Sequence, residues 1–168
     1  MSVITSRQAA KIELLKPVTV VSVGDAKRFV VSEAFGPDNP AGIKFWLKDN
    51  FKKLFFGLVE ENVPATELMI SILTKSLFDP SIIAKLGNRA ETKLAYLYEL
   101  LSKQPRGKSD HHLLTNGCAN IFYIRAMNSD FWSVHANWDD FFRGWVVFAD
   151  SVVYPLWRRD GDQVFSLG

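Results

Sequence analysis

The hydrophobic and polar pattern of the last third of the chain predicts a β-sheet. Runs of aromatic and β-branched residues alternate there with polar breaks, which is typical of successive antiparallel strands. The Trp-x-Val-x-Ala pattern at Trp132 and at Trp145 predicts two neighbouring strands with similar inner faces, because alternate side chains share a face. The predicted strand regions are Asn116–Arg125, Phe131–Trp138, Gly144–Val152, Trp157 and Gln163–Phe165.

Two helices are predicted in the middle of the chain. Asp79 is a candidate N-cap, Pro80 suits the first helical position, and Gly87 can end the helix because glycine tolerates the left-handed conformation. A second helix is expected over Asn88–Lys103, where an acidic residue follows the first residue at capping-box spacing. The buried stripe of this helix is predicted to be Leu94, Leu97, Tyr98 and Leu101.

The first half of the chain predicts a β-hairpin. Val18–Val23 is β-branched and reads as a strand, and Lys27–Ser32 is its expected partner across a turn at Gly24 and Asp25. A further strand is expected over Ile43–Leu47 and a short helix over Asn50–Phe56. Glu67–Leu73 allows either a strand or a helix, and we favour the strand. Residues 1–16 have only a weak helical pattern, which is compatible with a mobile arm.

These elements predict one α+β domain over residues 1–168. We expect an antiparallel sheet over residues 118–166 that packs on the helices of residues 79–103, with the N-terminal hairpin beside it. A chain of 168 residues is long enough to bury a hydrophobic core.

Composition and charge narrow the classes of partner. The 20 basic and 18 acidic residues nearly cancel and interleave along the chain, so a nucleic acid is not an expected partner. No segment approaches the ~20 apolar residues of a membrane span, and the N-terminus does not resemble a secretory signal. The single cysteine, Cys118, excludes an intramolecular disulfide. We therefore expect a cytoplasmic protein that does not bind membranes.

Candidate catalytic residues are few, because the chain has no Gly-x-Ser-x-Gly elbow, P-loop or dinucleotide fingerprint. His135 lies in a predicted strand, near Arg125 and Asp150 in the strand pattern. Together they could serve a small hydrolase or nuclease-like enzyme, provided that the histidine has a partner and a cleft. The other interpretation of His135 is a half-buried, hydrogen-bonded structural residue, which we favour.

Metal ligands are also sparse. Asp110, His111 and His112 are consecutive, and adjacent histidines diverge in both strands and helices. A zinc site needs three or four converging ligands. Asp139 and Asp140 could bind a divalent cation, although a charged turn explains them as well. We expect neither a metal nor a cofactor.

A binding surface is the remaining functional hypothesis. Phe141 and Phe142 occupy a polar turn, and exposed apolar pairs of this kind mark contact surfaces. Asn116 and Asn120 flank the first strand of the predicted sheet and could hold a ligand at the sheet edge, although Asn-Gly is also a common turn pair. The sequence thus favours a non-enzymatic binding or interaction protein, whose partner is another protein or a second copy of itself.

The motifs Leu113–Gly117 and Ala119–Arg125, together with Trp157 and the closing Gln163–Ser166, resemble those of a group of small uncharacterised bacterial proteins. The similarity extends back to Lys75. It implies a bacterial source and a shared fold, and it transfers no catalytic residue. The chain departs from the group at residues 126–130, where an acidic, glycine-containing turn is expected, so this hairpin could differ in shape.

Overall fold

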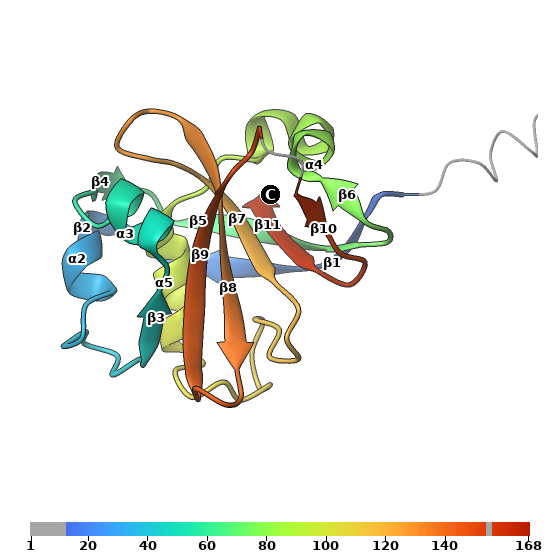
Figure 1. Ribbon diagram of the computed structural model, residues 1–168. Coiled ribbons are helices and arrows are strands. Elements are labelled where there is room, and N and C mark those ends of the chain that lie inside the picture. Colours follow the sequence, from blue (N-terminus) through green and yellow to red (C-terminus); the bar gives the residue numbers. More distant parts are fainter. Residues whose placement is uncertain (1–12, 154–155) are drawn as a thin grey trace, which may run out of the picture.

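The computed structural model describes residues 13–153 and 156–168, and strands dominate it (Figure 1). Strands contain 41% of the residues and helices 20%. The largest sheet has seven strands, in the order β1 (Leu15–Val23), β5 (Thr66–Leu73), β11 (Gln163–Leu167), β7 (Asn120–Arg125), β8 (Phe131–Asp139), β9 (Gly144–Ser151) and β3 (Phe45–Leu47). Its two edges are therefore β1 and β3.

The predicted fold class is wrong, because the strands and helices are arranged differently from the prediction. We expected a C-terminal antiparallel sheet packed on a central helical segment, whereas the sheet takes β1, β3 and β5 from the first half of the chain. The sheet is also mixed, because β11 runs parallel to β7 and β3 runs parallel to β9. Pairings between distant segments depend on tertiary packing, which a local pattern of side chains does not encode.

The predicted N-terminal hairpin is also wrong. β1 pairs with β5, while β2 (Ala26–Val30) pairs with β4 (Val59–Val63) in a separate sheet. The N–H of Gly24 donates to the Glu99 carboxylate at 2.7 Å, so the intervening turn is fixed by a helix far along the chain. The short helix α2 (Val31–Ala34) follows β2 and replaces the end of the expected strand.

Three further helices occur in the regions where the pattern places them, with shifted boundaries. They are α3 (Asp49–Phe55), α4 (Asp79–Leu86) and α5 (Leu94–Ser102), with a 3₁₀ turn η1 (Gly87–Arg89) after α4. The helix α5 begins at Leu94 rather than Asn88, because Glu91 forms a bridge with Tyr123 of β7 instead of entering the helix. Asp79 is the first helical residue rather than the cap, and no side chain caps α4.

The main sheet is covered on both faces, because alternate side chains of β7 enter two different hydrophobic cores. Phe122 and Ile124 enter the larger core, together with Leu94, Leu97 and Leu101 of α5. Ile121 and Tyr123 enter a second core, which contains Ile82 of α4. A strand buried on both faces reads as a continuous hydrophobic run, which explains the sequence of β7.

Small elements complete the fold. β6 (Leu77–Phe78) pairs with β10 (Trp157–Arg158) beside α4, so Trp157 lies outside the large sheet in which it was expected. Leu15 and Lys16 belong to β1, and residues 1–12 of the predicted arm lie outside the described residues. Within residues 13–153 and 156–168, no helix has the length and apolar character to cross a membrane.

Candidate functional site

His135 and Asp150 are brought together by the β8–β9 pairing. Ser133 lies opposite Asp150 in this register, so the side chain of His135 reaches Asp150 along one face of the sheet. The Nε2 atom of His135 lies 3.0 Å from Oδ2 of Asp150, and its Nδ1 atom lies 3.0 Å from Oδ1 of Asn137. The hydrogen-bond partner expected for His135 is therefore present.

Arg158 connects this pair to a buried ionic cluster. Its Nη2 group donates to Asp150 at 3.3 Å and to the Ser133 hydroxyl at 2.9 Å. Its guanidinium also donates to both carboxylate oxygens of Asp79, and the Tyr123 hydroxyl donates to the same carboxylate at 2.8 Å. The cluster thus joins α4, β7, β8, β9 and β10 through charge-assisted hydrogen bonds.

The environment shifts three pKa values in this cluster. Burial favours the neutral form of Asp150, but hydrogen bonds and charges from His135 and Arg158 outweigh burial and lower the pKa of Asp150. Burial, reinforced by the adjacent Asp79, raises the pKa of Tyr123 well above its ordinary value. Burial opposes the charge of Arg158, but Asp79 and Asp150 together raise the pKa of its guanidinium.

The cluster leaves little space for a substrate. His135 is only 8% exposed and its ring stacks on Phe148, with centroids 4.6 Å apart. Five cavities in the described part of the chain, of about 260 to 760 Å³, have neither His135 nor Asp79 in their lining. General acid–base catalysis requires hydrogen-bond reach to a bound substrate, and this geometry instead suits a structural cluster.

Arg125, the arginine that the sequence placed with His135, lies elsewhere. It pairs with Glu91 at 2.9 Å and donates to the carbonyl of Ser129 at 2.8 Å. The arginine that reaches Asp150 is Arg158, which the sequence pattern did not indicate. Nothing in the local pattern around Arg158 indicates this role, because all of its acidic partners lie on other elements.

The two candidate asparagines have different environments. Asn120 is fully buried, and its side-chain amide forms hydrogen bonds with Leu114, Ala136 and Gln163. Asn116 is exposed, and its side-chain oxygen accepts the N–H of Cys118 at 3.1 Å. Both therefore hold the backbone around the start of β7, and the structure does not combine them into one ligand-binding group.

The histidines of the polar loop lie on the surface. The Nδ1 atom of His111 lies 3.1 Å from Oδ1 of its neighbour Asp110. In the part of the chain that the structure describes, no group of three His, Cys, Asp or Glu side chains converges as metal ligands would.

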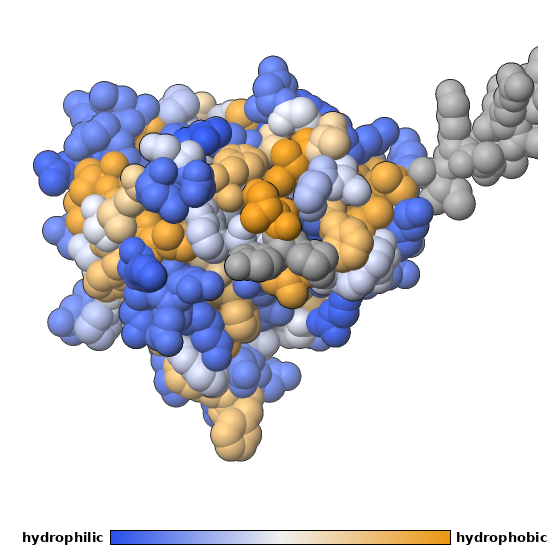
Figure 2. Space-filling view, turned by 45° about the horizontal axis from the view of Figure 1, so that its top comes forward, coloured by the Kyte–Doolittle hydropathy of each residue, from blue (hydrophilic) through white to orange (hydrophobic). Residues whose placement is uncertain are grey.

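The turn between β8 and β9 presents the two candidate phenylalanines in different ways. Oδ1 of Asp139 accepts the N–H of Phe142 at 2.7 Å and fixes the turn. The ring of Phe141 is fully exposed, and an apolar group protrudes at the bottom of Figure 2, where this hairpin ends. The ring of Phe142 instead packs against Trp46, with centroids 5.7 Å apart.

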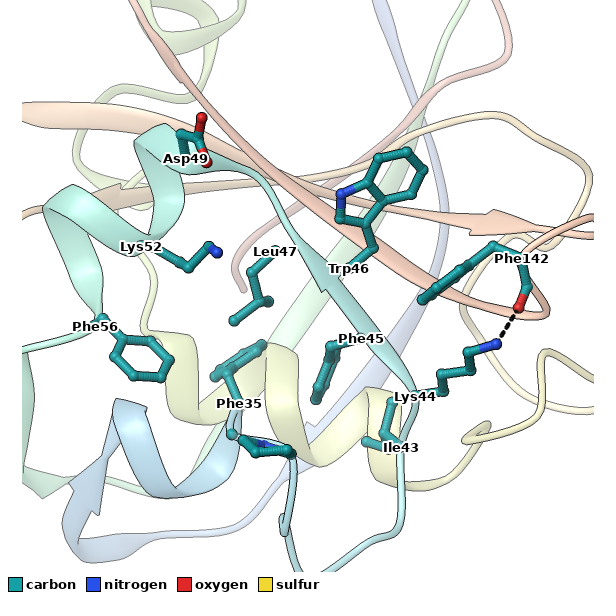
Figure 3. A pocket seen from close by; sticks show the side chains of 12 residues that line it. Phe35, Ile43, Lys44, Phe45, Trp46, Leu47, Asp49, Lys52, Phe56 and Phe142 are labelled. Carbon is teal, nitrogen blue, oxygen red and sulfur yellow. Dashed lines mark hydrogen bonds between the residues drawn. The ribbon is translucent and has the colours of Figure 1, made fainter.

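A groove of about 760 Å³ opens beside β3, and Phe142 forms part of its lining (Figure 3). Most of its lining is aromatic or aliphatic: Phe35, Ile43, Phe45, Trp46, Leu47, Phe56 and Phe142. Lys44, Lys52 and Asp49 supply its charged groups. Figure 3 shows Phe45 and Leu47 on one side of β3, facing Phe35, while Trp46 points away towards Phe142. The local sequence pattern does not predict this groove. Eleven of its twelve lining residues fall within residues 35–56, but the groove forms only when this segment folds back on itself and meets Phe142 of the β8–β9 turn.

Lysines lie against the aromatic rings of this region. The ammonium of Lys44 lies 4.2 Å from the ring centre of Phe142 and donates to the carbonyl of Phe142 at 2.8 Å. The ammonium of Lys48 lies 3.7 Å from the ring centre of Trp46, which is 46% exposed. Cation–π contacts of this kind orient both the lysines and the rings.

Comparisons of the chain with protein-family models, curated proteins and solved structures find no match. The resemblance to a group of bacterial proteins therefore stays a prediction.

Proposed function

We propose that this chain is a non-enzymatic binding protein. Its contact region is the aromatic surface, which we define as the β3 groove together with Trp46, Phe141 and Phe142. The observation that carries this proposal is the complete exposure of Phe141 at a hairpin tip adjacent to this groove. Large apolar rings surrounded by charged residues are typical of the central anchors of protein interfaces.

The alternative, a small hydrolase or nuclease-like enzyme using His135, Asp150 and Arg125, has less support. The histidine and Asp150 are within hydrogen-bond distance, but the histidine is buried and lines none of the five cavities described above. Arg125 is engaged with Glu91 instead. The partner in the binding proposal is another protein or a second copy of the chain. We also infer a cytoplasmic location, since one cysteine gives no intramolecular disulfide.

The proposal is tested by capture of partners on the immobilised protein and by analytical ultracentrifugation for self-association. Phe141→Ser and Trp46→Ala should each remove the interaction while the thermal melt of Phe141→Ser stays unchanged, because the Phe141 ring makes no buried contact. Val18→Ser is a matched control, since Val18 is 54% exposed on β1, at the opposite edge of the sheet. A partner that binds the wild type and both surface variants equally would overturn the proposal.

A further inference from the structure

The free edge of β3 presents unpaired backbone groups to the groove. The N–H of Trp145 donates to the carbonyl of Lys44 at 2.9 Å, and the N–H of Lys48 donates to the carbonyl of Val147 at 3.0 Å. Because backbone groups alternate in direction along a strand, those of Phe45 and Leu47 point away from β9. No hydrogen bond from elsewhere in residues 13–153 and 156–168 reaches them.

The groove beside this edge suits an extended chain. Its volume is about 760 Å³, and Phe35 and Phe56 lie across from β3 (Figure 3). An added strand would lie about 4.8 Å from β3, where its backbone can pair with Phe45 and Leu47. Alternate side chains of that strand would then contact the aromatic wall.

The charge of the groove selects an acidic occupant. Lys44 and Lys52 line it and Lys48 lies at the end of β3, whereas Asp49 is the one carboxylate in the lining. None of these three lysines belongs to an ion pair in the described part of the chain. The neighbouring cavity adds Arg106 and Arg143 against one carboxylate, Asp140, so basic groups remain in excess beyond Lys44. Complementary potentials steer association and determine specificity.

The same features favour a peptide over a single-stranded nucleic acid. Nucleic-acid grooves offer open ring faces on which bases stack. Here the ammonium of Lys48 covers one face of the Trp46 ring, and the ring of Phe142 lies tilted beside it. The groove instead presents the backbone of a strand, which a peptide can pair with.

We propose that the aromatic surface binds an extended acidic peptide segment, which adds to the free edge of β3 as a further strand. This inference rests on the proposed binding function and names its partner class. It requires three things: backbone pairing at Phe45 and Leu47, a negative charge on the peptide, and contact with the aromatic wall.

The test uses synthetic heptapeptides that alternate glutamate with phenylalanine, with amide chemical shifts and hydrogen exchange of the protein as readouts. Binding should shift the amides of Phe45 and Leu47 and slow their exchange. A peptide with lysine in place of glutamate, and a glutamate peptide N-methylated at every residue so that neither edge can donate, should both fail to bind. Lys52→Glu should weaken binding about five- to tenfold, while the matched variant Lys53→Glu, on the same helix but outside the groove lining, should not.

Four outcomes overturn the inference. They are equal binding of the lysine peptide, equal binding of the N-methylated peptide, shifts that map away from β3, and binding of a deoxythymidine 12-mer to this surface in place of the peptide. If partner capture still depends on Trp46 and Phe141 while no acidic peptide binds, the binding function stands and the peptide inference fails. If capture is independent of both residues, the binding function itself fails.

Discussion

Arg158 holds Asp79 with two hydrogen bonds, although the two residues are 79 positions apart in the chain. Nε donates to Oδ1 at 2.9 Å and Nη2 donates to Oδ2 at 3.0 Å, and both side chains are buried. Asp79 is the first residue of α4 and Arg158 lies in β10, so this pair attaches the C-terminal segment to the helix.

Removal of Arg158 should strongly destabilise the fold. Arg158→Met leaves the carboxylate of Asp79 buried without its counter-charge, and such changes cost about 3–5 kcal/mol. Urea titration of the variant measures the loss in free energy of unfolding. The double variant Asp79→Asn with Arg158→Met should lose less than the sum of the two single variants, because neither charge is then left alone. Additive losses would show that the two residues do not act as a pair.

The sequence pattern predicted the elements that depend on local side chains. The helix α4 and the strands β7, β8 and β9 have hydrophobic patterns that their own residues set, and Trp132 and Trp145 share an inner face as expected. Boundaries set by distant residues were predicted less well. The helix α5 begins at Leu94, where the Glu60 carboxylate accepts the N–H groups of Leu94 and Ala95, and Glu60 lies on β4.

The candidate sites also divide into contacts between neighbouring strands, which could be predicted, and contacts between distant segments, which could not. The contact between His135 and Asp150 was foreseeable, because β8 and β9 are neighbours along the chain and pair directly. The role of Arg158 was not, since its partners lie on α4, β8 and β9. The β3 groove also depends on the parallel pairing of β3 with β9, which brings residues a hundred positions apart together.

Leu97→Ala should lower the free energy of unfolding by about 2–5 kcal/mol, because the side chain of Leu97 is fully buried in the larger core and its loss leaves a cavity. Lys103→Ala, at the exposed end of the same helix, should cost less than about 1 kcal/mol, since it removes only a surface pair with Glu99. Denaturant titrations compare the two variants. A loss below about 1 kcal/mol for Leu97→Ala would contradict the packing of α5.

Glu60→Ala should destabilise the start of α5. Its carboxylate accepts the N–H groups of Leu94 and Ala95, both at 2.9 Å, and their loss should cost about 1–3 kcal/mol. Amide exchange at residues 94–97 should accelerate more than exchange at residues 98–102. Glu61 is an exposed neighbour on the same strand, and Glu61→Ala should leave exchange in α5 unchanged. Equal effects of both variants would show that Glu60 does not cap this helix.

The acid stability of the protein should depend on Asp150. Its pKa is lowered in the folded state, because His135 and Arg158 outweigh the effect of burial. The unfolded chain therefore takes up this proton first as the pH falls below about 4, and the stabilisation is lost as the pH falls through the lower folded pKa. Asp150→Asn should be less stable than the wild type by about 1–2 kcal/mol at pH 7.

The decisive measurement is the difference in free energy of unfolding between the wild type and Asp150→Asn from pH 7 to pH 2. The difference should shrink below about pH 4, because protonation removes from the wild type the charge that the variant already lacks. Asp160→Asn, at an exposed carboxylate, serves as the control and should follow the wild type throughout. A constant difference across this range would mean that the charge of Asp150 does not stabilise the fold, and that the bonds from His135 and Arg158 act without it.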